Sequence, residues 1–290
     1  MIKKGIILAG GAGSRMSPVT KAVNKQLLPL YDKPLFFYPL SVLMLAKIRD
    51  ILIIVNKGQI KQFQKILPNG NNLGIKISYL EQEKPKGLPD AFIIGEKFLD
   101  KKDVVLILGD NFFFGEGLTK KLINCTHLVN GAKVFLHPVK DPSQFGIANI
   151  TGNKITKIIE KPKKTKSNLA ITGLYFFDKK VIEYSKLLKP SKRNELEIVD
   201  LLNKYKEKNN LKFDMLGRGG TWLDTGSIKN FNSTSNFVQT IEERQGFKIG
   251  CIEEIAYNNK WIYKKEIKNA IEFYGKCNYS EYLSSLIRSK

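Results

Sequence analysis

The sequence is poor in cysteine, in long apolar runs and in acidic residues. No run of about 18 consecutive uncharged apolar residues occurs, so a transmembrane helix is not expected. The apolar segment near the first residue is too short for the core of a signal peptide, and we therefore expect a cytoplasmic protein without a membrane partner. The three cysteines, Cys125, Cys251 and Cys277, lie far apart, which argues against a disulfide framework and against a zinc site.

The shortage of acidic residues leaves a formal net charge of +21, because 48 lysines and arginines oppose 27 aspartates and glutamates. An excess of this size can indicate binding to nucleic acid. Here it is spread along the whole chain, and the densest segment, residues 161–166 (KPKKTK), is typical of a solvated loop. The charge distribution therefore predicts no nucleic-acid partner.

Apolar runs of strand length alternate with amphipathic segments of helix length in the first part of the chain, which is typical of βαβ units on a parallel sheet. The predicted strands there are Gly5–Ala9, Ile51–Val55, Ile75–Tyr79 and Val104–Leu108, and the helices are Tyr38–Ala46, Ile60–Leu67 and Ala91–Phe98. Strands then follow more closely at Ala132–Val139, Lys154–Glu160 and Ala170–Phe177, and helices return at Lys179–Leu188, Glu197–Lys208, Ser227–Thr240 and Tyr279–Ile287. The predicted fold class is α/β, with a Rossmann-like, mixed and mostly parallel central sheet flanked by helices and a small C-terminal helical appendage.

A glycine-rich loop with basic and no acidic residues follows the first predicted strand, in the segment LAGGAGSRMSPVTKAVNKQLLP at 8–29. Its glycines let backbone N–H groups turn toward an anion at the edge where open α/β sheets bind ligands. Arg15 and Lys25 suit a polyphosphate. A dinucleotide fingerprint would need glycine where Met16 stands, and no P-loop string occurs, which disfavours an NAD-dependent dehydrogenase.

Two aspartates stand alone in apolar or glycine-rich surroundings. Asp110 follows the all-aliphatic run Val104–Leu108 and Gly109, so a strand there would carry its carboxylate to the ligand-binding edge of the sheet. Asp224 lies in the string WLDTG. Aspartates at such places often cap a turn or a helix, and the local sequence leaves that alternative open.

The string GGAGSR, followed by Pro18 and by KQLLP at 25–29, resembles the signature of the sugar-1-phosphate nucleotidylyltransferases. The likeness continues in order over nearly the whole chain, through YDKPLFFYPLSVLMLA (31–46), IRDILII (48–54), LGDN (108–111), EKP (160–162), SNLAITGLYFFD (167–178), RNELEIVD (193–200), GRGGTWLDTG (217–226) and IEERQG (241–246). Such coverage makes the resemblance specific.

The resemblance implies attack by a sugar-1-phosphate oxygen on the α-phosphorus of a nucleoside triphosphate, with release of pyrophosphate. The implied substrates are dTTP and α-D-glucose 1-phosphate, and the implied product is dTDP-glucose, in the first step of dTDP-deoxysugar synthesis. Because two phosphate groups must approach each other, catalysis consists mostly of positioning and charge neutralisation. The implied cofactor is Mg²⁺, and the resemblance makes Asp110 and Asp224 its ligands.

The resemblance also assigns residues to three tasks. The residues implied in catalysis are Arg15, Lys25 and Lys161. Those implied in nucleotide binding are Gly10, Gly13, Arg15, Lys25, Gln26, Gln82, Gly87 and Asp110. Those implied in binding the sugar phosphate are Phe145, Gly146, Glu160, Lys161, Ile171, Arg193 and Trp222. A glutamine amide offers one acceptor and two donors, which matches the edge of thymine or uracil.

Several of these residues also allow a simpler interpretation from the local sequence. Gln82 could be a surface residue in a charged stretch, Lys161 could be merely solvated, and Arg193 could form a surface ion pair. Phe145 stands where the family typically carries tyrosine, which leaves the particular hexose open. UTP or another hexose 1-phosphate is therefore an alternative substrate. A non-catalytic protein that binds a sugar nucleotide or nucleic acid is a more distant alternative.

The resemblance further implies a division of the chain and an oligomer. We expect residues 1–240 to form the nucleotidyltransferase domain, including its sugar-binding part. Residues 241–290 are expected to form a helical region for contacts within a homotetramer. A second, product-binding regulatory site is implied near a subunit interface, and Arg244 and Gln245 are candidates for it.

Overall fold

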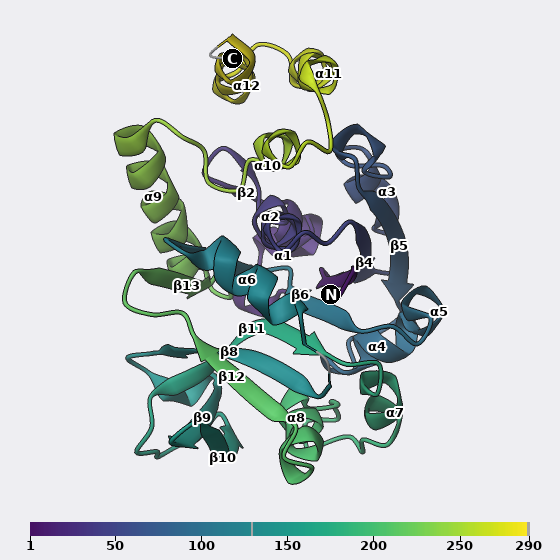
Figure 1. Cartoon of the computed structure of the whole chain (residues 1–290), viewed down its shortest axis with the longest axis vertical. Coiled ribbons are helices and arrows are strands. Elements are labelled where there is room, and N and C mark those ends of the chain that lie inside the picture. The colour runs from purple at the N-terminus through teal and green to yellow at the C-terminus, as the bar shows by residue number, and fades with distance from the viewer. Residues whose placement is uncertain (129, 289–290) are drawn as a thin grey trace.

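One nine-stranded sheet forms the centre of the fold (Figure 1). The computed structural model describes residues 1–128 and 130–288. The parallel half of the sheet has the order β6 (Val104–Leu108), β1 (Lys4–Leu8), β4 (Asp50–Asn56) and β5 (Lys76–Gln82). The other half, joined to β6 through the antiparallel strand β11, consists of β11 (Leu169–Phe177), β8 (Ala132–Pro138), β9 (Gly146–Thr151), β10 (Lys154–Glu160) and β12 (Leu211–Met215). The predicted α/β class with a mixed central sheet is confirmed.

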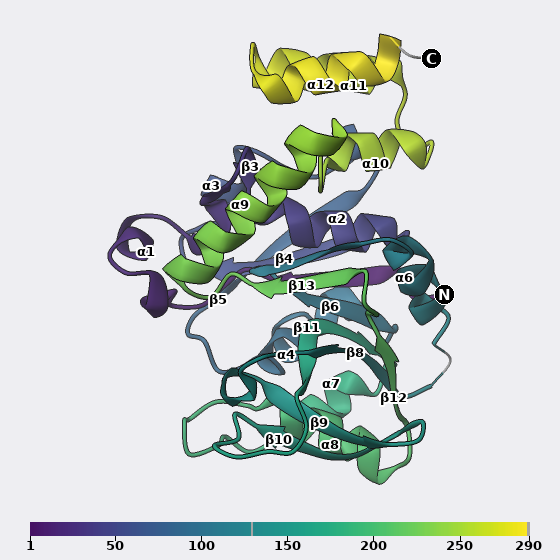
Figure 2. The ribbon, with the colours of Figure 1, turned by 90° about the vertical axis from the view of Figure 1, so that its left-hand side faces the viewer.

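Helices cover both faces of the parallel half (Figures 1 and 2). Alternate residues of β1, β4 and β6 point to opposite faces, and both sets are mainly apolar, as in other strands covered on two sides. Ile7, Ile53 and Ile107 pack with α2, whereas Ile6 and Leu52 belong to a second core on the other face. The first core takes in α2 (Phe37–Leu45), α3 (Ile60–Gln64) and α6 (Leu118–Thr126), and the second takes in α4 (Asp90–Ile94), α5 (Glu96–Leu99), α7 (Val181–Lys186) and α8 (Ile198–Glu207).

Some elements differ from the sequence-based prediction. The single helix expected at Ala91–Phe98 is two short helices, α4 and α5, which meet at Gly95. Strands β9 and β12 and two small antiparallel ribbons were not predicted. The ribbons pair β2 (Pro29–Leu30) with β3 (Lys33–Pro34) and β7 (Asn111–Gly115) with β13 (Gly220–Asp224). Short helical segments complete the list as α1 (Val19–Ala22), η1 (Ser14–Met16), η2 (Lys25–Leu27), η3 (Asn71–Leu73) and η4 (Pro142–Gln144).

The last part of the chain is helical, as predicted (Figure 1, yellow end). It contains α9 (Ile228–Gln245), α10 (Ile252–Asn258), α11 (Lys264–Tyr274) and α12 (Asn278–Arg288). Helix α9 continues past residue 240 to Gln245, and the division of the chain at that residue stays a prediction. Over residues 1–128 and 130–288, no helix has both the length and the apolar character that crossing a bilayer requires.

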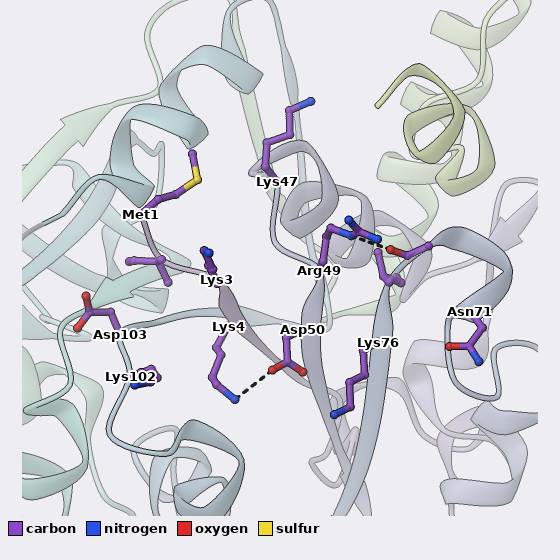
Figure 3. Close-up of a pocket in the computed structure, with 13 residues that line it drawn as sticks. Met1, Lys3, Lys4, Lys47, Arg49, Asp50, Asn71, Lys76, Lys102 and Asp103 are labelled. Carbon is purple, nitrogen blue, oxygen red and sulfur yellow. Dashed lines mark hydrogen bonds and ion pairs between the residues drawn. The ribbon is translucent and has the colours of Figure 1, made fainter. Parts of the chain in front are cut away.

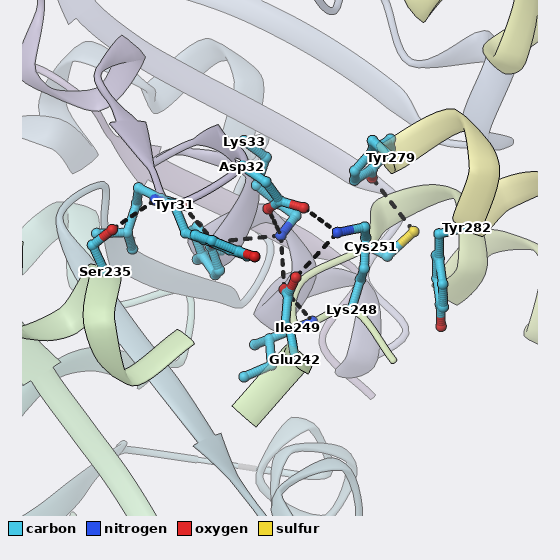
Figure 4. A network of polar contacts seen from close by, with 12 residues as sticks. Tyr31, Asp32, Lys33, Ser235, Glu242, Lys248, Ile249, Cys251, Tyr279 and Tyr282 are labelled. Atoms are coloured by element: carbon cyan, nitrogen blue, oxygen red, sulfur yellow. Dashed lines mark hydrogen bonds and ion pairs between the residues drawn. The ribbon is translucent and has the colours of Figure 1, made fainter. Parts of the chain in front are cut away.

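A buried network of charged side chains ties the end of α9 to the β2–β3 ribbon (Figure 4). Glu242 accepts hydrogen bonds from Lys33 Nζ at 3.0 Å, from Lys248 Nζ at 3.2 Å and from the Ile249 N–H at 2.8 Å. Asp32 binds the same two lysines. The side chains of Glu242 and Lys33 are only 4% and 2% exposed. Each charge in this cluster therefore depends on its partners, because water is largely excluded.

Glu242→Gln is expected to lower the free energy of unfolding by about 3 kcal/mol, because it leaves two buried ammonium groups with one carboxylate between them. Urea unfolding followed by circular dichroism measures the loss. The matched control is Glu243→Gln, an exposed neighbour on the same helix, which should change the free energy by no more than about 0.5 kcal/mol. Equal effects of the two substitutions would contradict the role of the network.

Candidate active site

The glycine-rich loop lies at the carboxyl ends of β1 and β4, where an asparagine holds it in place. Asn56, the last residue of β4, accepts the Gly11 N–H at 2.8 Å and donates to the Gly11 carbonyl at 2.9 Å. Gln82 Nε2 donates to Asn56 Oδ1 at 3.1 Å. A Cβ on Gly10 would lie 1.8 Å from Gln82 Nε2, so only glycine leaves room for this side chain. The structure thus brings Gly10 and Gln82 into contact.

Lys25 and Gln26 are held on η2, which packs against the same strand ends. The Asn24 side chain accepts the Gln26 N–H at 2.8 Å and donates to the Ala9 carbonyl at 3.1 Å. Lys25 and Gln26 are buried, at 7% and 5% exposure. Lys25 Nζ lies 2.6 Å from Asp110 Oδ2, so a cation already faces the carboxylate that follows β6.

Arg15, on η1, lies beside the second aspartate. Its loop turns at Gly13, whose φ of +58° is in the left-handed region. A Cβ built on Gly226 would lie 2.5 Å from Arg15 Nη2 and 2.9 Å from Asp224 Oδ2, so both side chains crowd against that glycine. The absence of a side chain at Gly226 is what allows Arg15 and Asp224 to approach from the same side.

Asp110 and Asp224, 114 positions apart in the chain, are joined by the β7–β13 ribbon. Asp224 pairs with Asn111 in the register of that ribbon. Thr225 donates to the Asp110 carbonyl twice, from its N–H at 3.0 Å and from its hydroxyl at 2.7 Å. Asn111 Nδ2 donates to Asp110 Oδ1 at 2.9 Å. These bonds fix the two aspartates as neighbours.

The two carboxyl groups respond to each other electrostatically. Burial and the negative charge of Asp110 raise the pKa of Asp224 above its ordinary value, against the opposing charges of Lys25 and Arg15. Burial also disfavours ionisation of Asp110, but the charge and hydrogen bond of Lys25, together with Asn111 and Arg15, lower its pKa. Lys25 thus keeps Asp110 ionised. Asp224 is harder to ionise, because its negative charge would be repelled by that of Asp110.

This pair fits a small divalent cation. Mg²⁺ takes one or two carboxylates together with phosphate oxygens and water, and it does not need a cage of protein ligands. In the described part of the chain no group of three or more histidine, cysteine, aspartate or glutamate side chains could hold a metal ion. Asp110 and Asp224 could hold such a cation. The contact of the Lys25 ammonium with Asp110 shows that positive charge is favourable beside these carboxylates.

Four of the residues expected at the sugar phosphate lie on β9, at the end of β10 and in the loop before α8, namely Gly146, Glu160, Lys161 and Arg193. Gly146 pairs with Glu160 across the β9–β10 ladder, and a Cβ on Gly146 would lie 3.3 Å from Glu160 Oε2. Burial raises the pKa of Glu160, although the charges of Lys161 and Arg193 oppose the shift. Arg193 Nη2 lies 3.3 Å from Glu160 and 2.7 Å from Glu197. The ion pair considered for Arg193 from the sequence therefore exists, and it includes Glu160.

Two aromatic rings form one wall of a cavity of about 710 Å³ beside Asp224. The rings of Phe145 and Trp222 meet edge to face, with centroids 5.1 Å apart. Arg15 and Asp224 also line this cavity. Ile171, by contrast, is buried in β11, and Gly87 forms a bridge to Leu196 so tight that a Cβ there would lie 2.0 Å from the Leu196 carbonyl oxygen.

Sequence reasoning missed three polar residues that organise the site, namely Asn56, Asn111 and Thr225. Each follows an apolar strand or one of the two aspartates, and a polar residue directly after a buried strand is the signal that could have indicated them. Gln82 is 5% exposed, which excludes the interpretation of this residue as a surface side chain. Lys161 remains largely exposed, with a side-chain exposure of 49%.

A second cavity, of about 950 Å³, opens at the opposite edge of the sheet (Figure 3). Its rim is basic, but several of these charges are used within the fold. Lys4 binds Asp50 at 3.0 Å, and Arg49 donates to the Gly74 carbonyl and lies over the ring of Trp261. None of the predicted site residues in the described chain lines this cavity, whose other basic residues are Lys3, Lys47, Lys76 and Lys102.

Comparisons with known proteins give a consistent result. A family model described as "Nucleotidyl transferase" matches residues 4–241. The chain is 48% identical over 285 residues to glucose-1-phosphate thymidylyltransferase of Neisseria gonorrhoeae, covering 98% of this chain and 99% of the relative. It is 42% identical to the enzyme of the same name from Mycolicibacterium smegmatis, covering 98% of this chain and 99% of that protein.

Two solved structures are similar as well. A Bacillus anthracis crystal structure, assigned as a glucose-1-phosphate thymidylyltransferase in complex with a sucrose, has a TM-score of 0.75 and 40% identity, covering 81% of this chain and 94% of that one. A UDP-glucose pyrophosphorylase complexed with UDP-glucose has a TM-score of 0.74 and 26% identity, covering 83% of this chain and 99% of that one.

Asp224→Asn is expected to raise the thermal midpoint of the protein at neutral pH in the presence of a chelator. Because the pKa of Asp224 is raised in the folded state, its ionisation destabilises the folded chain, and a neutral amide removes that cost. The gain should shrink as the pH falls, and it should vanish by about pH 3, below the ordinary aspartate pKa of about 3.9, where the wild-type side chain is protonated in both states. Calorimetric scans across this range measure it, with Asp103→Asn as a control for the charge change, and an unchanged or lowered midpoint would refute the repulsion.

Proposed function

The chain belongs to the nucleotidyl transferase family, and we propose that it acts as a glucose-1-phosphate thymidylyltransferase, which joins dTTP and α-D-glucose 1-phosphate to give dTDP-glucose and pyrophosphate. One observation carries the chemical part of the proposal. Asp110 and Asp224 meet beside Arg15 and Lys25, at the sheet edge that also holds the glycine-rich loop. A site with two acids and two cations suits a reaction between two phosphate groups.

In the proposed reaction, an oxygen of the sugar phosphate forms a bond to the α-phosphorus, and the bond from that phosphorus to the pyrophosphate oxygen breaks. The backbone of the glycine-rich loop binds the triphosphate, and Arg15 and Lys25 neutralise charge on it. When bound to Asp110 and Asp224, Mg²⁺ would supply further neutralisation of the phosphate charge. The side chains do little covalent work, so their positions decide the rate.

The sugar phosphate is proposed to bind toward β9 and β10. Glu160 accepts hydrogen bonds from sugar hydroxyls, and Gly146 leaves space because it has no side chain. Lys161 and Arg193 hold the phosphate, which requires Arg193 to exchange part of its bonding to Glu197 for the ligand. Phe145 and Trp222 enclose the hexose, and Ile171 shapes the pocket from β11.

On the base side, the buried amides of Gln26 and Gln82 are proposed to bind the pyrimidine edge, with Gly87 beside them. Uracil offers the same edge as thymine and lacks only a methyl group, which one apolar contact of about 1–3 kcal/mol distinguishes. The fold similarity to a UDP-glucose pyrophosphorylase favours UTP as a second candidate substrate.

Other parts of the proposal concern the assembly and the cell. We expect a cytoplasmic homotetramer that feeds dTDP-deoxysugar synthesis and that neither binds nucleic acid nor attaches to a membrane. Arg244 and Gln245 lie in the last turn of α9, and a regulatory site for the sugar nucleotide near them stays a prediction.

The substrate assignment is tested by measuring pyrophosphate release with dTTP, UTP, ATP and GTP, each combined with several hexose 1-phosphates. dTTP with glucose 1-phosphate is expected to give a kcat/KM about tenfold or more above that of any other pair, which corresponds to about 1.4 kcal/mol of discrimination. A higher value with UTP would favour the second candidate. Absence of pyrophosphate release from every pair would contradict the enzyme class.

Asp110→Asn is expected to lower kcat about a hundredfold to a thousandfold, because a lost carboxylate weakens cation binding worth several kcal/mol at the transition state. Steady-state kinetics at saturating substrates measure the effect. Asp103→Asn is the matched control, since Asp103 and Asp110 flank the same strand at opposite edges of the sheet. Normal turnover in Asp110→Asn at low Mg²⁺ would refute the assignment.

A further inference from the structure

The side chain of Trp222 lines the cavity with its ring, and its N–H also makes a buried hydrogen bond that lining a cavity does not require. Its indole Nε1 donates to Asn111 Oδ1 at 2.6 Å, and the two residues are 7% and 2% exposed. The same oxygen accepts the Gly173 N–H at 3.1 Å. Two donors on one oxygen determine the orientation of the Asn111 amide, because its NH₂ group could accept neither bond.

The opposite end of that amide reaches Asp110. Asn111 Nδ2 donates to Asp110 Oδ1 at 2.9 Å, while Lys25 binds Oδ2 at 2.6 Å. The backbone of Asp110 is fixed separately by the two hydrogen bonds from Thr225. The freedom that remains to Asp110 is rotation of its carboxylate, and the Asn111 amide limits that rotation.

The geometry points to Trp222 as a positioning residue that acts through Asn111 to orient the Asp110 carboxylate for a divalent cation. This inference rests on the proposed function, in which Asp110 holds the cation. It assigns the indole N–H a task separate from that of the indole ring, which meets Phe145 and lines the cavity.

The physical reason lies in what the Asn111 amide would do without the indole N–H. With Trp222 no longer donating, the Asn111 oxygen keeps only the Gly173 N–H, so one hydrogen bond in place of two holds the plane of the amide. The Nδ2 donor is then directed less firmly at Asp110 Oδ1, and the Asp110 carboxylate rotates over a wider range. Asp110 would bind a cation less tightly, because more of that freedom would be lost on binding.

The test measures binding of Mn²⁺ by electron paramagnetic resonance, without nucleotide or sugar, to the full-length wild-type protein and to Trp222→Phe. Phenylalanine keeps an aromatic ring but lacks the N–H. The dissociation constant is expected to rise about threefold to tenfold, as the loss of one hydrogen bond predicts. Trp261→Phe, the other tryptophan of the chain, is the matched control and should change the constant by less than about twofold.

A double-mutant cycle separates the hydrogen bond from ring packing. In an Asn111→Leu background, Trp222→Phe should change the Mn²⁺ constant by less than about twofold, because the residue that transmits the effect is gone. An effect as large as that in the wild-type background would overturn the inference. If Asn111→Leu does not fold, the steady-state kinetics of the single variant Trp222→Phe test the inference instead. The Mg²⁺ concentration for half-maximal rate, measured at saturating glucose 1-phosphate, should then rise about threefold or more, and an unchanged Mg²⁺ requirement would overturn the inference.

Asp110→Asn keeps this inference distinguishable from the proposed function. If Asp110→Asn binds Mn²⁺ as tightly as the wild type, the cation site of the proposed function is wrong. If Asp110→Asn loses binding while Trp222→Phe binds like the wild type, only the positioning role of Trp222 is wrong. If both lose affinity and Trp261→Phe does not, both proposals are supported.

Discussion

The repulsion between two half-buried carboxylates, Asp110 and Asp224, is the constraint on which the candidate site depends. Burial and the charge of Asp110 make ionisation of Asp224 costly, and Lys25 keeps Asp110 ionised by direct contact. A fold that holds two like charges together in this way favours any dense positive charge that enters between them. The same arrangement costs stability while both groups are ionised, and under the proposed function it would give affinity for a cation, so stability and function would oppose each other at this point.

The surrounding structure supplies the rigidity that such a repulsion requires. The β7–β13 ribbon pairs Asp224 with Asn111, and Thr225 closes the contact to the backbone of Asp110. Helix α9 begins four residues after Asp224, and its far end is held by the buried bonds of Glu242 to Lys33 and Lys248. The ribbon and the helix thus anchor the second aspartate from both sides, although neither contributes to the central sheet.

Much of the fold was predictable because it depends on local pattern. Strands β1, β4 and β6 are apolar at every inner position, and polar residues occur only at the ends of β1 and β4, which is what strands covered on both faces need. The prediction of one helix over 91–98 was wrong in detail, because the helix is interrupted at Gly95 and two short helices form. The β7–β13 ribbon could not be foreseen, because its strands lie more than a hundred residues apart and neither has a distinctive pattern.

The sequence by itself determined the class of fold and the identity of the charged groups, because periodicity and a glycine-rich basic loop are properties of neighbouring residues. It also placed Asp110 at the end of a buried strand. Only the tertiary structure decided that Asp224 reaches Asp110, that Lys25 contacts one of its oxygens, and that Asn111 and Trp222 determine its orientation. The physical reason is that electrostatic and hydrogen-bond energies depend on distance in space, and residues far apart in sequence are brought to that distance by folding alone.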